Sequence, residues 1–206
     1  MGSRRTAQDI NDTWHSIYNV GFRQQLGKSK YSSIGHWNDP DMLVVGKVGY
    51  GLGENTDGLR ETRLTPDEQY THITLWTLVA SNLLIGCDIS QMDDFTLNLL
   101  SNNEVIAIDQ DILGKQADRV FKDDDIEIWA RPLADGSQAV GIFNVSDKDV
   151  TYTLDNGQWT MENGQWTLDN GQWTMDNFQP SATCGARKTC RRMTVHGLSR
   201  LTDVGI

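Results

Sequence analysis

Three acidic side chains stand where their type and spacing could support hydrolysis of a glycosidic bond. In the stretch GHWNDPDMLVVG, Asp39 and Asp41 flank Pro40 on a stiff turn, directly before an apolar run. Asp9 lies in RTAQDINDTW, just ahead of a segment with helical spacing. A pair of carboxyl groups at the carboxyl ends of parallel strands is the arrangement that glycoside chemistry needs. The residues alone also allow structural roles, because Asp9 or Asp12 could cap the helix and Asp39 could hold the turn.

The composition argues against several other classes of function. The chain has 206 residues and a net charge of −10, so a nucleic-acid partner is not expected. No apolar run has the length needed to cross a bilayer, and no membrane partner is expected. The first residues, MGSRRTAQDINDTW, lack the apolar core of a secretory signal, so the localisation stays open. No Cys/His spacing resembles a metal site, and neither a metal nor a cofactor is expected.

Hydrophobic spacing predicts an α/β arrangement for the first part of the chain. Residues 12–22 have helical periodicity, and a second helix should begin after Thr65, with Pro66 in its first position and Glu68 completing a capping box, and run to about Ala80. The apolar run SNLLIGCDIS predicts a parallel strand buried on both faces, and the acids that open DDFTLNLLSN favour a further helix. KVGYGLGENTDGLRETR is expected to form an exposed loop. This alternation is typical of an α/β layer with parallel strands.

After Gly114 the pattern changes to short alternating segments. DIEIWARPL, QAVGIFNVS and DVTYTLD predict strands, and ADGS is typical of a hairpin turn between the first two. These segments predict a second, antiparallel β unit.

A tandem repeat follows, with DNGQWTM, ENGQWTL and DNGQWTM between residues 155 and 175. Each unit carries Asn-Gly, a strong hairpin signal. Two interpretations remain open: an expansion at the DNA level without a function, or a sugar-binding hairpin array that uses Trp159, Trp166 and Trp173. The basic segment after the repeat has little periodicity and is expected to be disordered.

Three long motifs point to a known family. WNDPDMLVVG, LTPDEQYTHITLWTLVASNLLIGCDIS and NNEVIAIDQDILGKQA resemble, in order and spacing, the α-galactosidase (melibiase) family, glycoside hydrolase family 27. The resemblance covers Arg5 to about Leu154. It implies a (β/α)8 TIM barrel followed by an antiparallel β-sandwich, and hydrolysis of terminal α-galactosides with retention. We therefore expect an α/β fold with the last three βα units of the barrel over 1–115, a sandwich fragment including the repeat over 116–177, and a disordered or frameshifted tail over 178–206.

The same resemblance implies roles for individual residues. RTAQDINDTW is similar to the family segment that carries a substrate-binding arginine and the acid/base aspartate. Asp9 would be the general acid/base, and it must stay protonated near neutral pH, which requires burial or a second carboxylate nearby. Arg5 would bind the substrate or hold the carboxylates, Asp41 would accept hydrogen bonds from sugar hydroxyls, Met42 would line the pocket, and Trp37 would contact the substrate or shape the turn. The expected partner is an α-galactoside, although related family members cleave other sugars.

The sequence departs from the family pattern in ways that affect activity. The family nucleophile lies in a Lys-x-Asp motif on an earlier strand, and no such motif stands at a strand end here, since Lys122 and Lys148 precede acids only in the β unit. Arg4 stands where the family usually has Trp. Part of a barrel leaves open strand edges and an exposed apolar face, which predicts self-association. The alternatives to a hydrolase fragment that lacks its nucleophile are an inactive fragment and a sugar-binding module.

The tail also suggests a shifted reading frame. Residues 182–190, ATCGARKTC, can be encoded by GCG ACC TGT GGC GCC AGA AAG ACC TGC. Read from the third base, these codons give Asp-Leu-Trp-Arg-Gln-Lys-Asp-Leu, a stretch that the sandwich of the family often carries. The hypothesis is a frameshift near the repeat, and the coding DNA tests it directly.

Overall fold

The computed structural model describes residues 2–49, 58–148 and 150, together with the backbone of 159–162, 165–168 and 199–201. In this part of the chain no helix has the length and apolarity to cross a membrane. The helical elements are α1 (Trp14–Ile17), the π-helical η1 (Tyr18–Arg23), the 3-10 turns η2 (Ser29–Tyr31) and η3 (Ile89–Gln91), α2 (Pro66–Leu78), α3 (Asp94–Leu100) and α4 (Asn103–Asp109). The strands are β1 (Gly2–Arg5), β2 (His36–Asp39), β3 (Lys47–Val48), β4 (Arg60–Glu61), β5 (Asp118–Lys122), β6 (Ile126–Pro132), β7 (Gln138–Asn144), β8 (Trp159–Glu162), β9 (Gln165–Leu168) and β10 (Ser199–Leu201).

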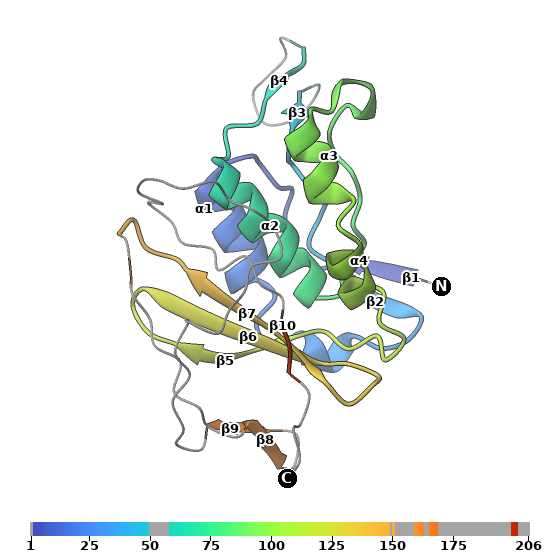
Figure 1. Cartoon of the computed structure of the whole chain (residues 1–206), viewed down its shortest axis with the longest axis vertical. Coiled ribbons are helices and arrows are strands. Elements are labelled where there is room, and N and C mark those ends of the chain that lie inside the picture. The colour runs from blue at the N-terminus through green and yellow to red at the C-terminus, as the bar shows by residue number, and fades with distance from the viewer. Residues whose placement is uncertain are drawn as a thin grey trace.

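Two kinds of sheet divide the molecule. β1 and β2 pair in parallel, whereas β5, β6, β7 and β10 form an antiparallel sheet in the order β10-β7-β6-β5. Figure 1 shows α1 and α2 lying over one face of the antiparallel sheet, while β1 and β2 lie to its side. The short strands β3 and β4 pair with each other, as do β8 and β9. The change from a parallel to an antiparallel pattern after Gly114 is thus confirmed.

Helix α2 begins as its sequence predicts. The Thr65 hydroxyl accepts a hydrogen bond from the Glu68 amide at 3.3 Å, and the Glu68 carboxylate accepts one from the Thr65 amide at 2.8 Å. Pro66 occupies the first position, where its missing N–H costs no hydrogen bond. A reciprocal cap of this kind stabilises a helix by about 0.5–2 kcal/mol.

The helix predicted over 12–22 is also present, as α1 continued by η1. Its cap is neither of the two aspartates that the sequence offered. The Thr13 hydroxyl accepts from the Ser16 amide at 3.3 Å, whereas Asp12 forms ion pairs elsewhere. Asp9 and Asp12 are therefore free of a capping role.

Aromatic side chains join the helices to the antiparallel sheet. Phe22, on η1, packs edge-on against Trp129 of β6 and Phe143 of β7, with ring centroids 6.2 and 5.1 Å apart. All three side chains are buried. Leu78, at the end of α2, lies so close to Gly141 of β7 that a Cβ there would come within 2.5 Å of it. This layer belongs to one hydrophobic core, which also includes Ile10 and Leu43 from the segments that follow β1 and β2.

The buried carboxylate of Glu127 is a polar link between the same two layers. Its Oε1 accepts from the Tyr18 hydroxyl at 3.0 Å, from Lys122 at 2.8 Å and from Arg119 at 3.3 Å. Its Oε2 accepts from the Trp129 indole N–H at 3.2 Å. Every neighbour donates, so the charge is compensated although the side chain has no exposure.

The buried strand predicted for SNLLIGCDIS is not formed. The segment is extended, but it makes only a single parallel bridge, between Ile85 and Leu43. The Leu43 amide donates to Leu84 O at 2.7 Å and the Gly86 amide donates to Leu43 O at 2.9 Å. Leu84 and Ile85 are about half exposed, at 52% and 50%. A strand is buried only if neighbours cover it, and in the described residues this segment has a partner on one edge alone.

The second β unit agrees with its prediction where it is described. β6 and β7 pair through the predicted ADGS turn, in which the Leu133 amide donates to Ser137 O at 2.9 Å. β5, whose charged residues obscure its alternation, was not predicted. β8 and β9 form an antiparallel pair from two neighbouring repeat units, as the Asn-Gly signal indicates. The third unit, the tryptophan side chains and most of DVTYTLD lie outside the described residues. Within the predicted tail, residues 199–201 form β10, which pairs with β7.

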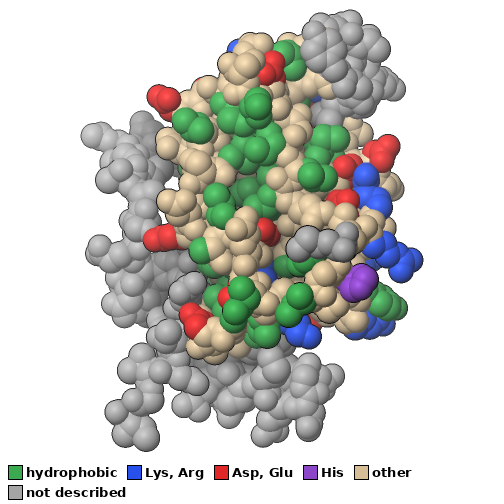
Figure 2. Space-filling model, turned by 90° about the vertical axis from the view of Figure 1, so that its right-hand side faces the viewer, with side chains coloured by type: hydrophobic (Ala, Val, Ile, Leu, Met, Phe, Trp, Pro, Cys, Tyr) green, Lys and Arg blue, Asp and Glu red, His purple; other side chains and the backbone are tan. Residues whose placement is uncertain are grey.

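One side of the molecule exposes large apolar side chains. Ile34, Ile85 and Ile112 are 72%, 50% and 81% exposed and line a cavity of about 740 Å³. Figure 2 shows this side, with hydrophobic side chains gathered down its centre. Exposed patches of this kind mark surfaces that pack against other protein.

A partly buried acid and a fully buried arginine lie between α2, α4 and β6. Arg131, on β6, has no exposure, and its Nη1 donates to Thr77 O at 2.8 Å. Asp109, the last residue of α4, has a carboxylate oxygen that is buried without a hydrogen-bond partner. Burial raises the pKa of Asp109 to about 7, although the positive charge of Arg131 opposes that rise.

The first prediction concerns this acid. Between its ordinary pKa of 3.8 and about 7, native Asp109 keeps a proton that the unfolded chain has lost, so stability falls as pH rises through this window. Asp109→Asn removes the ionisation, and we expect it to raise the free energy of unfolding at pH 8 by roughly 2–4 kcal/mol. Urea unfolding of both proteins from pH 4 to pH 8 measures the effect.

The same two proteins at pH 4 provide the control, because the carboxyl group and the amide are then both neutral. Their stabilities should agree within about 1 kcal/mol there. Stability curves that run parallel across the whole range would contradict a raised pKa for Asp109.

Candidate active site

The parallel pair β1 and β2 brings two distant segments to one edge. Arg5 lies opposite Asp39 in the register, and the Thr6 amide donates to Asp39 O at 2.8 Å. Both strands end at this level, so the residues that follow them emerge side by side. Asp41 follows β2 by two residues, and Asp9 follows β1 by four.

Asp41 is the residue on which these segments converge. Its Oδ2 accepts from Arg5 Nη2 at 2.5 Å and from the Ile10 amide at 2.8 Å, and its Oδ1 accepts from the Met42 amide at 2.8 Å. Its main-chain oxygen accepts from the Trp76 indole N–H at 2.7 Å. The residue is only 7% exposed. Three donors already occupy a carboxylate that can accept about four hydrogen bonds.

The backbone at Asp41 is strained. Its φ is +97°, a conformation that costs residues other than glycine of order 1–3 kcal/mol. The Asp39 carboxylate holds the turn, since its Oδ1 accepts from the Asp41 amide at 2.9 Å. The predicted Asx hydrogen bond beside Pro40 is therefore confirmed. Of the two acids in the stretch, one supports the turn and the other is placed by it.

Arg5 joins Asp41 to Asp9. The same Nη2 atom that contacts Asp41 also lies 2.9 Å from Asp9 Oδ1. The Asp9 side chain is fully exposed, at 100%, and that of Arg5 is 40% exposed. The described residues therefore do not bury Asp9 in the way that was expected for a general acid. Both candidate carboxylates, Asp9 and Asp41, do contact the guanidinium of Arg5.

Of the other two candidate residues, Met42 contacts this ion-pair chain through its amide and Trp37 lies apart from it. Met42 is half-buried, and its Sδ lies 2.5 Å from where a Cβ at Gly86 would be, so that position requires glycine. Trp37 lines the apolar cavity beside Leu43, whose lining does not include Arg5, Asp9 or Asp41. The structure therefore brings together Arg5, Asp9, Asp41 and the Met42 amide, but not Trp37.

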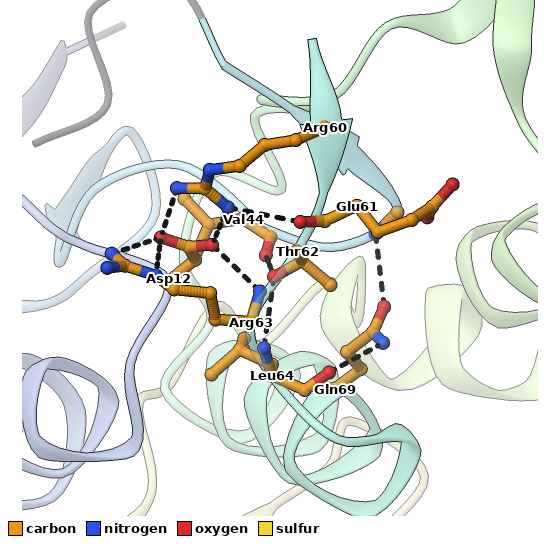
Figure 3. Close-up of polar contacts among 9 residues, drawn as sticks. Asp12, Val44, Arg60, Glu61, Thr62, Arg63, Leu64 and Gln69 are labelled. Atoms are coloured by element: carbon orange, nitrogen blue, oxygen red, sulfur yellow. Dashed lines mark hydrogen bonds and ion pairs between the residues drawn. The ribbon is translucent and has the colours of Figure 1, made fainter. Parts of the chain in front are cut away.

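Sequence reasoning missed a second ion-pair cluster nearby. Asp12, fully buried, accepts from Arg60 Nη1 at 2.5 Å and from Arg63 Nη2 at 2.7 Å (Figure 3). Burial by itself would raise the pKa of Asp12, but hydrogen bonds from Arg60 and Arg63 lower it to about 2. The signal in the sequence was the pair of arginines in GLRETR, which lies about 50 residues away and has no local relation to Asp12.

No group of three or more potential metal ligands is present among the described side chains. The side chains of the ion-pair chain from Asp9 to Asp41 are able to transfer protons and to form hydrogen bonds.

Comparisons with known proteins identify the family of this chain. The family model for α-galactosidase A matches residues 2–111, and the model for the α-galactosidase C-terminal β-sandwich domain matches residues 123–178. This chain belongs to the α-galactosidase A family. Its fold is the C-terminal part of a (β/α)8 barrel followed by part of an antiparallel β-sandwich.

Individual relatives show how much of the family this chain covers. An α-galactosidase of Cyamopsis tetragonoloba is 41% identical over 151 residues, which are 73% of this chain and 33% of that protein. A β-L-arabinopyranosidase from Geobacillus stearothermophilus has a TM-score of 0.67 at 35% identity over 74% of this chain and 34% of its own. An α-galactosidase from Saccharomyces cerevisiae, solved with raffinose, has a TM-score of 0.57 at 29% identity over 68% and 30%. The chain thus spans about a third of the length of the curated relatives it matches.

The second prediction tests the arrangement around Asp41 in this family member. Asp41→Asn keeps the size and tolerates the positive φ, but it turns an amide NH₂ toward one of the groups that now donate to the carboxylate. We expect a loss of roughly 2–4 kcal/mol in the free energy of unfolding, measured by urea denaturation.

Asp39→Asn is the matched control. Its side-chain oxygen can still accept from the Asp41 amide, so the loss should stay below about 1 kcal/mol. Equal losses in the two variants would mean that Asp41 is not the point on which the donors converge.

Proposed function

We propose that this chain carries the acid/base half of a retaining glycoside hydrolase site that acts on terminal α-galactosyl residues. The observation that supports this most directly is the single guanidinium of Arg5 between Asp9 and Asp41, at the ends of two parallel strands. The match to the α-galactosidase A family adds the substrate class.

The proposed roles follow from the environment of each residue. Asp9 acts as the general acid and then as the general base, because it alone among these acids is open to a leaving group. Arg5 holds Asp9 and Asp41 at fixed separation. Asp41 has acceptor capacity for about one further hydrogen bond, which a sugar hydroxyl can fill. Met42, whose amide contacts Asp41, forms one wall.

Retention requires a second carboxylate about 5–5.5 Å from the acid. Asp41 does not suit that role, because donors hold both of its oxygens. The Lys-x-Asp motif of the family has no counterpart at the end of a parallel strand in the described residues, since Lys122 and Asp124 stand at the end of β5, in the antiparallel sheet. We infer that another polypeptide segment supplies the nucleophile and that it docks on the apolar side around Ile34 and Ile85.

The third prediction tests this function by complementation. The chain is mixed with a separately expressed N-terminal two thirds of the Cyamopsis tetragonoloba relative, and hydrolysis of an aryl α-galactoside is followed. We expect activity in the mixture and none from either part alone. Asp9→Asn should lower the activity of the mixture by about 10²–10⁴-fold, the usual contribution of a general acid.

Asp124→Asn is the control, since Asp124 is an exposed acid in the turn before β6. It should leave the activity unchanged. A mixture that associates, as shown by analytical ultracentrifugation, but remains inactive would overturn the proposed function.

A further inference from the structure

The segment that carries Asp9 has no regular secondary structure of its own. It runs from the end of β1 at Arg5 to the start of α1 at Trp14. Its fixed points are Ile10, which is buried and whose amide donates to Asp41 Oδ2, and Asp12, which is fully buried. Asp9 therefore stands immediately before one fixed point and three residues before the other.

Asp12 is held more tightly than any other carboxylate near the site. It accepts five hydrogen bonds: from Nη1 and Nη2 of Arg60, and from the amide, Nε and Nη2 of Arg63. Nη1 and Nη2 of Arg60 donate to the two different oxygens, the planar two-donor geometry that gives arginine–carboxylate pairs their directionality, whereas Nε and Nη2 of Arg63 share Oδ1. An acceptor with five donors around it has little freedom to move.

The arginines are themselves tied to the stretch that follows Asp41. Between them, the Thr62 amide donates to Gly46 O at 2.8 Å and its hydroxyl donates to Val44 O at 2.8 Å. Gln69 of α2 accepts from the Gly46 amide at 3.0 Å and donates to Leu64 O at 3.2 Å (Figure 3). The Asp12 cluster thus connects the Asp9 segment to the Asp41 segment by a second route, independent of Arg5.

We propose that Asp12, through Arg60 and Arg63, is a positioning residue for the acid/base Asp9. This inference rests on the proposed function for the role of Asp9, but not for the placement of the segment. With both routes intact, the backbone on either side of Asp9 is fixed relative to Asp41. Without Asp12, the hydrogen bonds that still hold the segment would be those of Arg5 and Thr6 on one side of Asp9 and those of the Ile10 and Asn11 amides on the other. A displacement of about 1 Å at a catalytic group can cost about 10²-fold in rate.

The fourth prediction uses amide hydrogen exchange in the full chain, which needs no activity. In Asp12→Asn, an amide replaces one acceptor oxygen opposite two guanidinium groups, and the Ile10 amide should exchange at least about tenfold faster. Glu127→Gln is the matched control, because Glu127, on β6, is an equally buried carboxylate that accepts hydrogen bonds from two cationic side chains of β5. It should speed exchange in β6 and leave the Ile10 amide unchanged. Unchanged exchange at Ile10 in Asp12→Asn would overturn the inference.

The fifth prediction uses leaving groups in the complemented mixture. A misplaced general acid slows substrates with poor leaving groups, which need protonation, and spares those with good leaving groups. For Asp12→Asn we expect kcat/KM to fall about 10–100-fold on an alkyl α-galactoside and less than about threefold on the dinitrophenyl α-galactoside. Glu127→Gln should lower both equally, as a purely structural loss would. Equal losses in Asp12→Asn would also overturn the inference.

Two further comparisons keep the outcomes separate. If Asp12→Asn does not fold, Arg60→Gln replaces it, because this variant keeps the Arg63 contacts and should show a smaller effect in the same direction. A wild-type mixture without activity would defeat the proposed function, while the exchange of the Ile10 amide would still decide the role of Asp12.

Discussion

The placement of Asp41 is the constraint on which the rest of this structure depends. Its carboxylate accepts hydrogen bonds from Arg5, at the end of β1, and from the Ile10 amide, in the segment that carries Asp9. Its main-chain oxygen accepts from the indole N–H of Trp76, on α2. The Trp76 ring is fully buried, and a buried indole N–H requires an acceptor, so the position of α2 is linked to the end of β2. The cost of a φ of +97° is offset by these contacts. A strained residue that joins a strand end, a loop and a helix is typical of a site whose geometry has to be fixed in advance.

Asp12 and Asp109 show how partners, and not burial alone, set the pKa of a carboxyl group. Asp12 and Glu127 are both fully buried, and each faces two cations at hydrogen-bond distance. Asp109 is also largely buried, but Arg131 acts on it only at longer range, and its pKa rises to about 7. The two compensated acids connect elements: Asp12 joins the Asp9 segment to β4, and Glu127 joins η1 to the antiparallel sheet. Asp109 makes no comparable link, which is why its neutral form suits the fold better than its charged form.

The features that could be predicted from the sequence are those whose cause is local. The capping box of α2, the Asx turn at Asp39 and the ADGS hairpin each depend on residues within a few positions of one another. The failure at SNLLIGCDIS has the opposite origin, because a hydrophobic run specifies a buried strand only if other strands cover it. The contacts of Asp12 depend on arginines about 50 residues away, and no pattern within a short window contains that information. Trp37 shows the same limit, since its place in a motif does not reveal which cavity its ring lines.

The exposure of Asp9 and the exposure of the apolar side have one explanation under the proposed function. In a closed barrel, each strand end faces the others across the axis, so a catalytic carboxylate is enclosed by residues from several βα units. Here the parallel sheet consists of β1 and β2, and the next extended segment adds only a single bridge. Arg5, Ile10 and Asp12 therefore fix the backbone around Asp9 on one side, while its side chain stays exposed to solvent on the other. Docking of a further barrel segment would enclose this acid and cover Ile34 and Ile85 at the same time. This chain thus fixes the position of Asp9, whereas the docked barrel segment would enclose it.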